Sequence, residues 1–370
     1  MQNSAVISLE SVRCARIFIF IFFAVIACAG VGGCNGSGSK QDYSYVTAPE
    51  VVLRDRLAAA YAKTGVLHNG ERVVVLERQQ NRRFVRVRSS RGEEGWVQER
   101  YLTDQQTFDE FQRLVEQFKN TPAQAVAEVR RQVNLHVTPG RKSEHLYQLN
   151  ENQKVDLLER KVADKNAAPG AEAQKTENKE AESEPPADEE RAPGKPSVEP
   201  VLEDWWLVRD SQQRVGWVLG RMLYVDVPIE VAVYAEGHRI IAFYILDRVQ
   251  DEDKSVPEYL MLLSENKDGM PYDYDQARVF TWNLRRHRYE TAYRGASLSG
   301  FLPVTLGKEN FGKEGDLRTF TLQVADESGK LHPQKYKFNP PIVRQVLAPG
   351  EEPVPKVHHK PAKARKGHSR

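Results

Sequence analysis

The stretch from Phe84 to Asp104 reads FVRVRSSRGEEGWVQERYLTD, and it is the part of the chain that decides the fold class. Apolar and charged residues alternate over Phe84–Arg88, and this period of two predicts a β-strand with one buried face. A second strand is predicted at residues 95–97, where Gly95 permits close backbone approach and the Trp96 indole is expected to fill the core. Upstream, Asn69-Gly70 is a tight-turn signal. Short strands separated by turns predict a small antiparallel barrel.

This pattern occurs twice in the chain, at two constant offsets. An offset of 82 residues aligns early strand positions, for example Leu53 with Leu135. An offset of 121 residues aligns the later strands and places Trp96 on Trp217. The difference between the offsets, 121 − 82 = 39 residues, indicates one insertion within the second copy.

The order of strands and turns resembles the bacterial SH3-like (SH3b) domain over about residues 44–104 and 130–226. The resemblance is carried by Leu53-Arg54, Asn69-Gly70-Glu71, Val73–Leu76, Phe84–Arg88, Gly95-Trp96-Val97 and Tyr101-Leu102, and in the second copy by Val133-Asn134-Leu135, Thr138-Pro139-Gly140, Trp205–Arg209 and Gly216-Trp217-Val218. The second copy departs from the family at His136, where Arg is usual, and at Asn150 and Asn152, which replace the turn glycine. The resemblance implies tandem modules that bind cell-wall peptide or glycan without catalysis.

The N-terminus predicts export and lipid attachment. Arg13 and Arg16 precede the apolar run 17–27, which is too short to span a bilayer and is typical of a signal peptide. Val31, Gly32, Gly33 and Cys34 follow and resemble a bacterial lipobox. This resemblance implies cleavage before Cys34 and a lipid anchor on its sulfur, so that the membrane is a partner and the protein resides in the bacterial cell envelope, facing away from the cytoplasm. The outer membrane is expected if the host has one. A looser match at Cys28, and an ordinary signal peptide with incidental cysteines, remain alternatives.

Composition and cysteine usage exclude several function classes. Lys and Arg total 53 against 51 Asp and Glu, so no globally basic nucleic-acid-binding protein is expected. The three cysteines all lie within the first 34 residues, so the body has no disulfide, no Cys-zinc site and no thiol nucleophile. His238, His287 and His332 lack metal-site spacing. We therefore expect no catalytic residues, no metal and no cofactor.

Helical and strand patterns extend beyond the two copies. The spacing Thr103…Gln106 predicts a capping box for a helix with an apolar face from Phe108 to Phe118, and Thr121-Pro122 predicts a second short helix. Seven strands are predicted downstream, at 239–246, 258–263, 277–282, 288–293, 300–306, 319–325 and 334–338. The first four of them resemble an antiparallel meander.

The predicted fold is mainly β, with two small SH3-like barrels joined by a short helical linker and followed by an antiparallel β-sandwich-like domain. The boundaries are a lipoprotein signal peptide at 1–33, a flexible tether at 34–43, a first SH3-like domain at 44–104, a helical linker at 105–129, a second SH3-like domain at 130–226 with a disordered insertion at 162–203, a C-terminal antiparallel β domain at 227–347 and a disordered basic tail at 348–370.

One cluster in the C-terminal domain is a candidate ligand site. Its members are arginines, a histidine and aromatic residues, the types that hold carboxylates and sugars: Trp282, Arg285, Arg286, His287, Arg288, Tyr289 and Tyr293. A polar hairpin tip without a ligand is the alternative. The acidic residues Glu265, Asp273 and Asp275 are expected to be solvated loop residues, with paired carboxylates as the alternative.

Three functions are consistent with these patterns. The first is a non-catalytic envelope lipoprotein that binds peptidoglycan through its SH3-like modules. The second is an envelope scaffold that binds a protein partner. The third is a wall hydrolase whose active site lies in the C-terminal domain.

Overall fold

The computed structural model describes residues 41–58, 60–80, 83–166 and 200–347, and these residues are mainly β-structure. The signal peptide, the lipobox with Cys34 and the tail 348–370 lie outside the described residues. Within these ranges, no helix has both the length and the apolar composition needed to span a bilayer.

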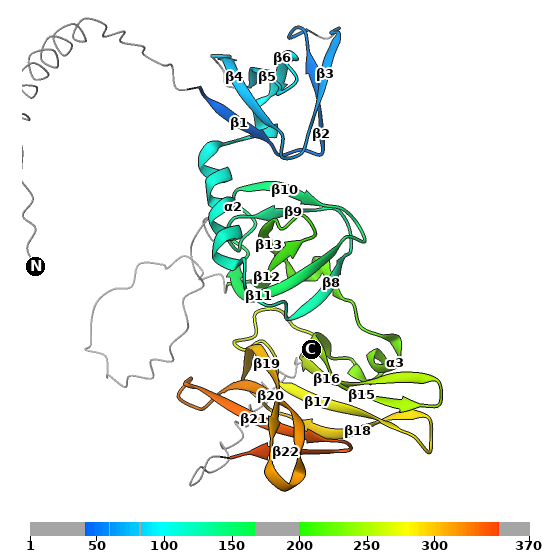
Figure 1. The fold of residues 1–370 in the computed structure, drawn as a ribbon. Coiled ribbons are helices and arrows are strands. Elements are labelled where there is room, and N and C mark those ends of the chain that lie inside the picture. Colours follow the sequence, from blue (N-terminus) through cyan, green and yellow to red (C-terminus); the bar gives the residue numbers. More distant parts are fainter. Residues whose placement is uncertain (1–40, 59, 81–82, 167–199, 348–370) are drawn as a thin grey trace, which may run out of the picture. The chain divides into compact units, whose positions relative to one another are not determined.

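Seven antiparallel strands form the first sheet (Figure 1). In sheet order they are β3 (Lys63–His68), β2 (Glu50–Arg54), β6 (Glu94–Gln98), β5 (Phe84–Arg88), β4 (Arg72–Arg78), β1 (Tyr43–Val46) and β7 (Leu102–Asp104). A short 3-10 turn, η1 (Glu99–Tyr101), precedes β7. The flexible tether predicted at 34–43 is one residue too long, because Tyr43 already pairs with Val74.

The second sheet repeats this arrangement. In sheet order its strands are β10 (His145–Leu149), β9 (Val133–His136), β13 (Val215–Leu219), β12 (Leu202–Asp210), β11 (Lys154–Asp164), β8 (Ala125–Val129) and β14 (Leu223–Val225), with η2 (Gly220–Met222) before the last. Each strand is the seventh after its counterpart in the first sheet. The two sheets therefore share one strand order.

Both sheets also bury the same set of positions. The first core contains Leu53, Leu67, Val73, Val85, Val87 and Val97. The residues aligned with them by the two offsets are all buried as well, namely Leu135, Leu149, Val155, Trp206, Val208 and Val218. The two offsets thus relate positions that are buried in both sheets.

The predicted core role of Trp96 is wrong. In β6, Gly95 and Val97 face the core, so the pleat turns Trp96 outward, where it is partly buried. The expectation for Gly95 is confirmed, because an added Cβ would lie 2.9 Å from the Leu53 Cβ atom. Valine and leucine side chains, rather than the indole, fill this core.

The helix α2 (Gln105–Phe118) follows β7, one residue later than the predicted capping box. Its N-cap is Asp104, whose side chain accepts a hydrogen bond of 2.9 Å from the Thr107 backbone N–H. The second predicted helix is not formed. Residues 121–124 are irregular and 125–129 form β8, which pairs with β11 and β14. The predicted linker 105–129 therefore includes the first strand of the second sheet.

The insertion predicted at 162–203 is shorter than expected. The β11–β12 ladder continues through the pairs Val162 with Asp204 and Ala163 with Glu203. Ala163 is buried, and Arg141 holds the buried Glu203 carboxylate with hydrogen bonds of 2.6 and 2.8 Å. The β11–β12 hairpin therefore includes residues at both ends of the predicted insertion. Residues 167–199 lie outside the described part of the chain.

Two four-stranded antiparallel sheets complete the described chain. The third sheet is the meander β15 (Arg239–Asp251), β16 (Lys254–Ser264), β17 (Gln276–Asn283) and β18 (Arg288–Gly295), and the fourth is β19 (Gly300–Asn310), β20 (Asp316–Ala325), β21 (Leu331–Asn339) and β22 (Ile342–Val346). The short helical segments are α3 (Ile229–Ala232), η3 (Val233–Ala235) and η4 (Gly312–Glu314). Each of the seven predicted runs lies within an observed strand, and β22 was missed.

The third sheet is buried on both faces. Leu260, Leu262 and Val279 belong to the large core that continues into the second and fourth sheets. Tyr259, Met261 and the other residues of the opposite face pack with Val231 of α3 and Ala235 of η3. This two-sided burial explains the nearly continuous apolar run at Tyr259–Leu263.

A buried ion-pair network joins the second sheet to the loop before β17. The Arg160 guanidinium donates to Asp204 at 2.6 Å and Asp273 at 3.2 Å, and also to the carbonyl oxygens of Met270 and Tyr272. Asp204 also accepts a hydrogen bond of 2.7 Å from Arg239. Burial raises the pKa of Asp273, against the lowering effect of Arg160. The expectation that Asp273 and Asp275 are solvated is wrong, since both are 9% exposed.

Replacing Arg160 by Ala should lower the free energy of unfolding by about 3–5 kcal/mol, because the buried Asp273 loses its ion-pair partner and the buried Asp204 keeps only Arg239. Urea unfolding of residues 35–370 measures the effect. The matched control is Arg56→Ala, whose side chain is 68% exposed and should cost less than about 1 kcal/mol. Equal effects of the two substitutions would contradict the role given to Arg160.

Candidate functional site

An aromatic and basic surface covers the outward side of the first sheet. We call it the Trp96 face, and it consists of Arg54, Tyr61, Phe84, Arg86, Arg88, Glu94 and Trp96. Alternation along β5 and β6 sends five of these side chains outward, while Val85, Val87 and Val97 face the core. Arg54 of β2 is the register partner of Trp96, and Tyr61 lies under the Arg54 guanidinium group. Trp96 lies between Arg54 of β2 and Arg86 of β5, its partners in strand register.

The Trp96 face has more positive than negative charge. Arg88 Nε donates to Glu94 Oε1 at 2.7 Å, and Arg86 donates to Oε2 of the same carboxylate at 3.1 Å. These contacts, with Arg88 the largest contributor, hold the pKa of Glu94 below its usual value. The Arg54 guanidinium carbon lies 4.1 Å from the Tyr61 ring centroid. Arg86 and Arg88 thus share one carboxylate, and Arg54 lies over Tyr61, an aromatic ring of the kind that can contact a sugar or peptide.

Only three of the seven residues predicted to form a cluster at the β17–β18 hairpin, namely Trp282, His287 and Tyr289, lie close together. Trp282 Nε1 donates to Asp251 at 2.7 Å, and His287 Nδ1 lies 2.7 Å from the same carboxylate oxygen. The hydrogen bond with His287, followed by that with Trp282, lowers the pKa of Asp251. Tyr289 packs edge-on against Trp282, with 4.9 Å between ring centroids, and is buried.

The remaining members of that cluster have other surroundings. Arg286 and Arg288 both pair with Glu290, while the Arg285 backbone N–H donates to Asn283. A register shift after Val279 moves Tyr293 to the opposite face of the sheet, where its hydroxyl lies 3.1 Å from that of Tyr336. The seven residues therefore do not form one surface, because the bulge breaks the alternation that the sequence suggested.

Sequence reasoning missed a buried carboxylate beside this hairpin. Glu258 of β16 is 2% exposed and accepts a hydrogen bond of 3.3 Å from the Trp282 backbone N–H. Burial raises the pKa of Glu258 to about 7, against the lowering effect of the Trp282 hydrogen bond and with a smaller contribution from the charge of Asp247, its cross-strand partner. Glu258 is the charged residue just before the apolar run Tyr259–Leu263, and its burial was not predicted from the sequence.

Glu258 predicts a measurable pH dependence of stability. A raised pKa means that the folded state binds the proton more tightly, so this stabilisation is complete below about pH 4.5 and is lost as the pH rises through about 7. The free energy of unfolding of the wild type, minus that of Glu258→Gln, should fall by about 3 kcal/mol between roughly pH 4 and pH 8. A pH-independent difference between the two proteins would refute this assignment.

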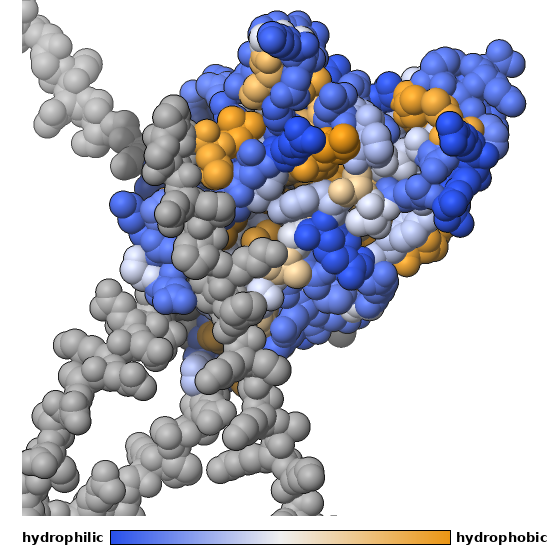
Figure 2. All heavy atoms as spheres, turned by 90° about the horizontal axis from the view of Figure 1, so that it is seen from below, coloured by the Kyte–Doolittle hydropathy of each residue, from blue (hydrophilic) through white to orange (hydrophobic). Residues whose placement is uncertain are grey.

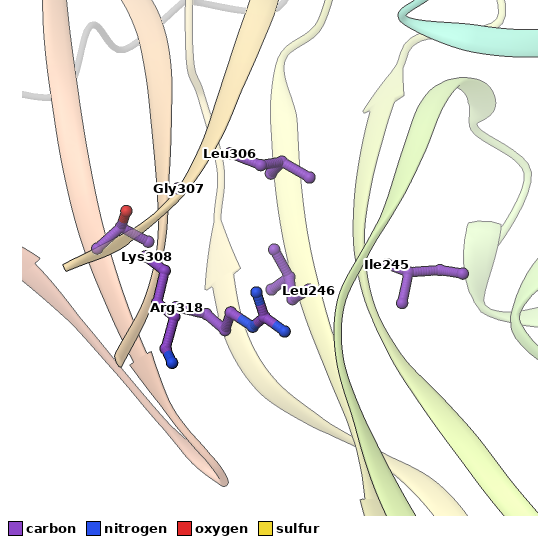
Figure 3. Close-up of a pocket in the computed structure, with 7 residues that line it drawn as sticks. Ile245, Leu246, Leu306, Gly307, Lys308 and Arg318 are labelled. Carbon is purple, nitrogen blue, oxygen red and sulfur yellow. The ribbon is translucent and has the colours of Figure 1, made fainter. Parts of the chain in front are cut away.

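A pocket of about 290 Å³ lies between β15 and the β19–β20 hairpin (Figure 3). It is lined by Ile245, Leu246, Leu306, Gly307, Lys308, Arg318 and Thr319. Ile245 and Leu306 are each more than 40% exposed, and Figure 2 shows separate apolar patches on a mostly hydrophilic surface. Both cations already have carboxylate partners, since Lys308 lies 3.2 Å from Asp316 and Arg318 lies 3.6 Å from Asp247. The pocket therefore offers no uncompensated charge to a ligand.

The histidines named in the sequence lie apart and have different partners. His238 contacts Gln276, His287 contacts Asp251, and His332 contacts Asp326. Across the described residues, no group of three or more His, Cys, Asp or Glu side chains is arranged to hold a metal ion.

Comparison with known proteins identifies one module. Residues 52–103 match the family model described as bacterial SH3 domain, so the first sheet contains a bacterial SH3 domain. No curated protein matches the chain.

Six chains of solved structures match this chain. A NlpC/P60 family protein from Bacillus cereus is 12% identical, over 56% of this chain and 65% of that one, with a TM-score of 0.21. NlpC1 from Trichomonas vaginalis is 9% identical, over 68% and 87% of the two chains, with a TM-score of 0.15. NlpC2 from the same organism is 11% identical, over 83% and 96%, with a TM-score of 0.16. The chain thus spans about two-thirds of the Bacillus cereus protein's length, and these TM-scores are too low to bear on fold or activity.

Proposed function

We propose that this protein is a non-catalytic lipoprotein of the bacterial cell envelope that binds peptidoglycan. The observation that carries the proposal is the bacterial SH3 domain at residues 52–103, a module associated with cell-wall binding. The second sheet, with the same strand order and the same buried positions, is proposed to be a second SH3-like module.

The absence of catalysis is also part of the proposal. Residues 35–370 contain no cysteine, so a thiol nucleophile is excluded from the body of the chain. The Trp96 face instead offers guanidinium groups and aromatic rings, which bind without reacting.

Membrane attachment is proposed to depend on Cys34. A single acyl chain gives only marginal binding, so stable anchoring requires the further acyl chains that the lipoprotein resemblance implies. Cys34→Ala should move the protein from the membrane fraction to the soluble fraction, while Cys28→Ala should leave it in the membrane fraction. The reverse outcome would place the lipidation site at Cys28.

Co-sedimentation of residues 35–370 with purified wall sacculi tests wall binding. We expect saturable binding that persists at moderate salt, because aromatic contacts are not screened as exposed charges are. If salt releases all of the bound protein, exposed charges account for the whole interaction and the expected aromatic contacts make no contribution. If no protein sediments with sacculi at any salt concentration, the proposed function is wrong.

A further inference from the structure

The outward faces of the first and second sheets differ in residue type and in exposure. On the second sheet, the positions aligned with Phe84, Arg86, Glu94 and Trp96 hold Trp205, Leu207, Val215 and Trp217. These four side chains are 0–4% exposed, and Leu114, Val115 and Phe118 of α2 pack against them. Figure 1 shows α2 alongside this sheet. The second sheet therefore has an apolar version of the Trp96 face, and a helix of the same chain occupies it.

A pair of aligned arginines shows the same contrast. Arg209 is aligned with Arg88, and its side chain is 12% exposed. It donates to the carbonyl oxygens of Phe118, Lys119 and Thr121 at 3.2–3.4 Å, at and just after the C-terminal end of α2. The Arg88 side chain is 50% exposed and contacts only the Glu94 carboxylate among the contacts described for it.

From this contrast we infer that the chain has one wall-ligand site, the Trp96 face of the first sheet, and that α2 closes the equivalent face of the second. This inference rests on the proposed wall-binding function and adds to it the location, the number and the ligand chemistry of the site. The ligand is the carboxylate-bearing stem peptide of peptidoglycan.

The guanidinium groups of the Trp96 face indicate a ligand that carries a carboxylate. Arg86 and Arg88 each carry five N–H donors, whereas Glu94 supplies only two acceptor oxygens, so donors remain for a ligand carboxylate. Guanidinium groups bind carboxylates in a planar, two-bond geometry. Trp96, the register partner of Arg86, provides flat apolar surface beside it, and Tyr61, which is 41% exposed, contacts Arg54, the register partner of Trp96 on its other side. The second sheet has Leu207 and Val215 in place of Arg86 and Glu94. These apolar side chains pack against α2 and offer no donor to an anion.

Titration calorimetry on residues 35–370 tests the inference with a disaccharide-tetrapeptide muropeptide as the probe. We expect one binding site per chain and at least tenfold weaker binding of the same muropeptide with amidated stem carboxylates. Trp96→Ala and Arg88→Gln should each weaken binding by about tenfold or more. Trp96→Phe should restore most of the affinity that Trp96→Ala loses, since a ring remains.

Two controls separate binding from folding. Arg72→Gln replaces an exposed arginine of the same sheet that lies outside the Trp96 face, and its affinity should equal that of the wild type. Thermal unfolding should be unchanged in Trp96→Ala, because Trp96 does not belong to the core of the first sheet. Amide chemical shifts should change along β5 and β6 and not along β12 and β13.

The outcomes distinguish this inference from the function beneath it. If Trp96→Ala and Arg88→Gln bind sacculi and muropeptide as the wild type does, wall binding stands and the assigned face is wrong. Two sites per chain, or shifts along β12 and β13, would show that α2 does not close the second face. Sacculus binding without muropeptide binding, or equal affinity for the amidated probe, would overturn the stem-peptide assignment. No sacculus binding would remove the proposed function and this inference together.

Discussion

Successive side chains of a β-strand point to opposite faces, and this constraint determines how both seven-stranded sheets are used. Because Val97 and Val218 face inward, Trp96 and Trp217 must face outward. Both cores are filled by aligned residues, most of them aliphatic, and the outward faces are free to differ. One became arginine-rich and exposed, and the other became apolar and lies under α2. The alternation of side chains thus gives the two sheets equivalent buried positions, while their outward surfaces differ.

Buried charge is the second constraint, and it connects parts of the chain that are distant in sequence. Arg160 and Asp204 lie on neighbouring strands of the second sheet, and Asp273 comes more than 60 residues after Asp204. A buried charge is stable only when it is paired and hydrogen-bonded, so these groups require one another. Arg209 acts similarly at the end of α2, where it donates to three carbonyl oxygens. Polar contacts of this kind tie the second sheet to α2 and to the loop before β17.

Local patterns predicted most of the elements. Alternation and turn signals located several strands of the first two sheets and seven of the eight later strands, because these properties depend on neighbouring residues. Errors arose where distant pairing outweighed local preference. The residues after Thr121-Pro122 became β8 because β11 and β14 were available as partners. The predicted hairpin cluster was divided because a bulge near Tyr293 reverses the faces, and no local pattern marked that bulge.

The sequence by itself determined the mainly β fold, the recurrence of one apolar spacing at two constant offsets and the absence of cysteine from residues 35–370. These conclusions depend on residue type and on spacing along the chain. Only the tertiary structure decided that Trp96 faces outward with Arg54 and Arg86, that the equivalent Trp217 is covered by α2, and that Glu258 and Asp273 are buried. Exposure is a property of what packs against a residue, and the residues that pack here are far away in sequence.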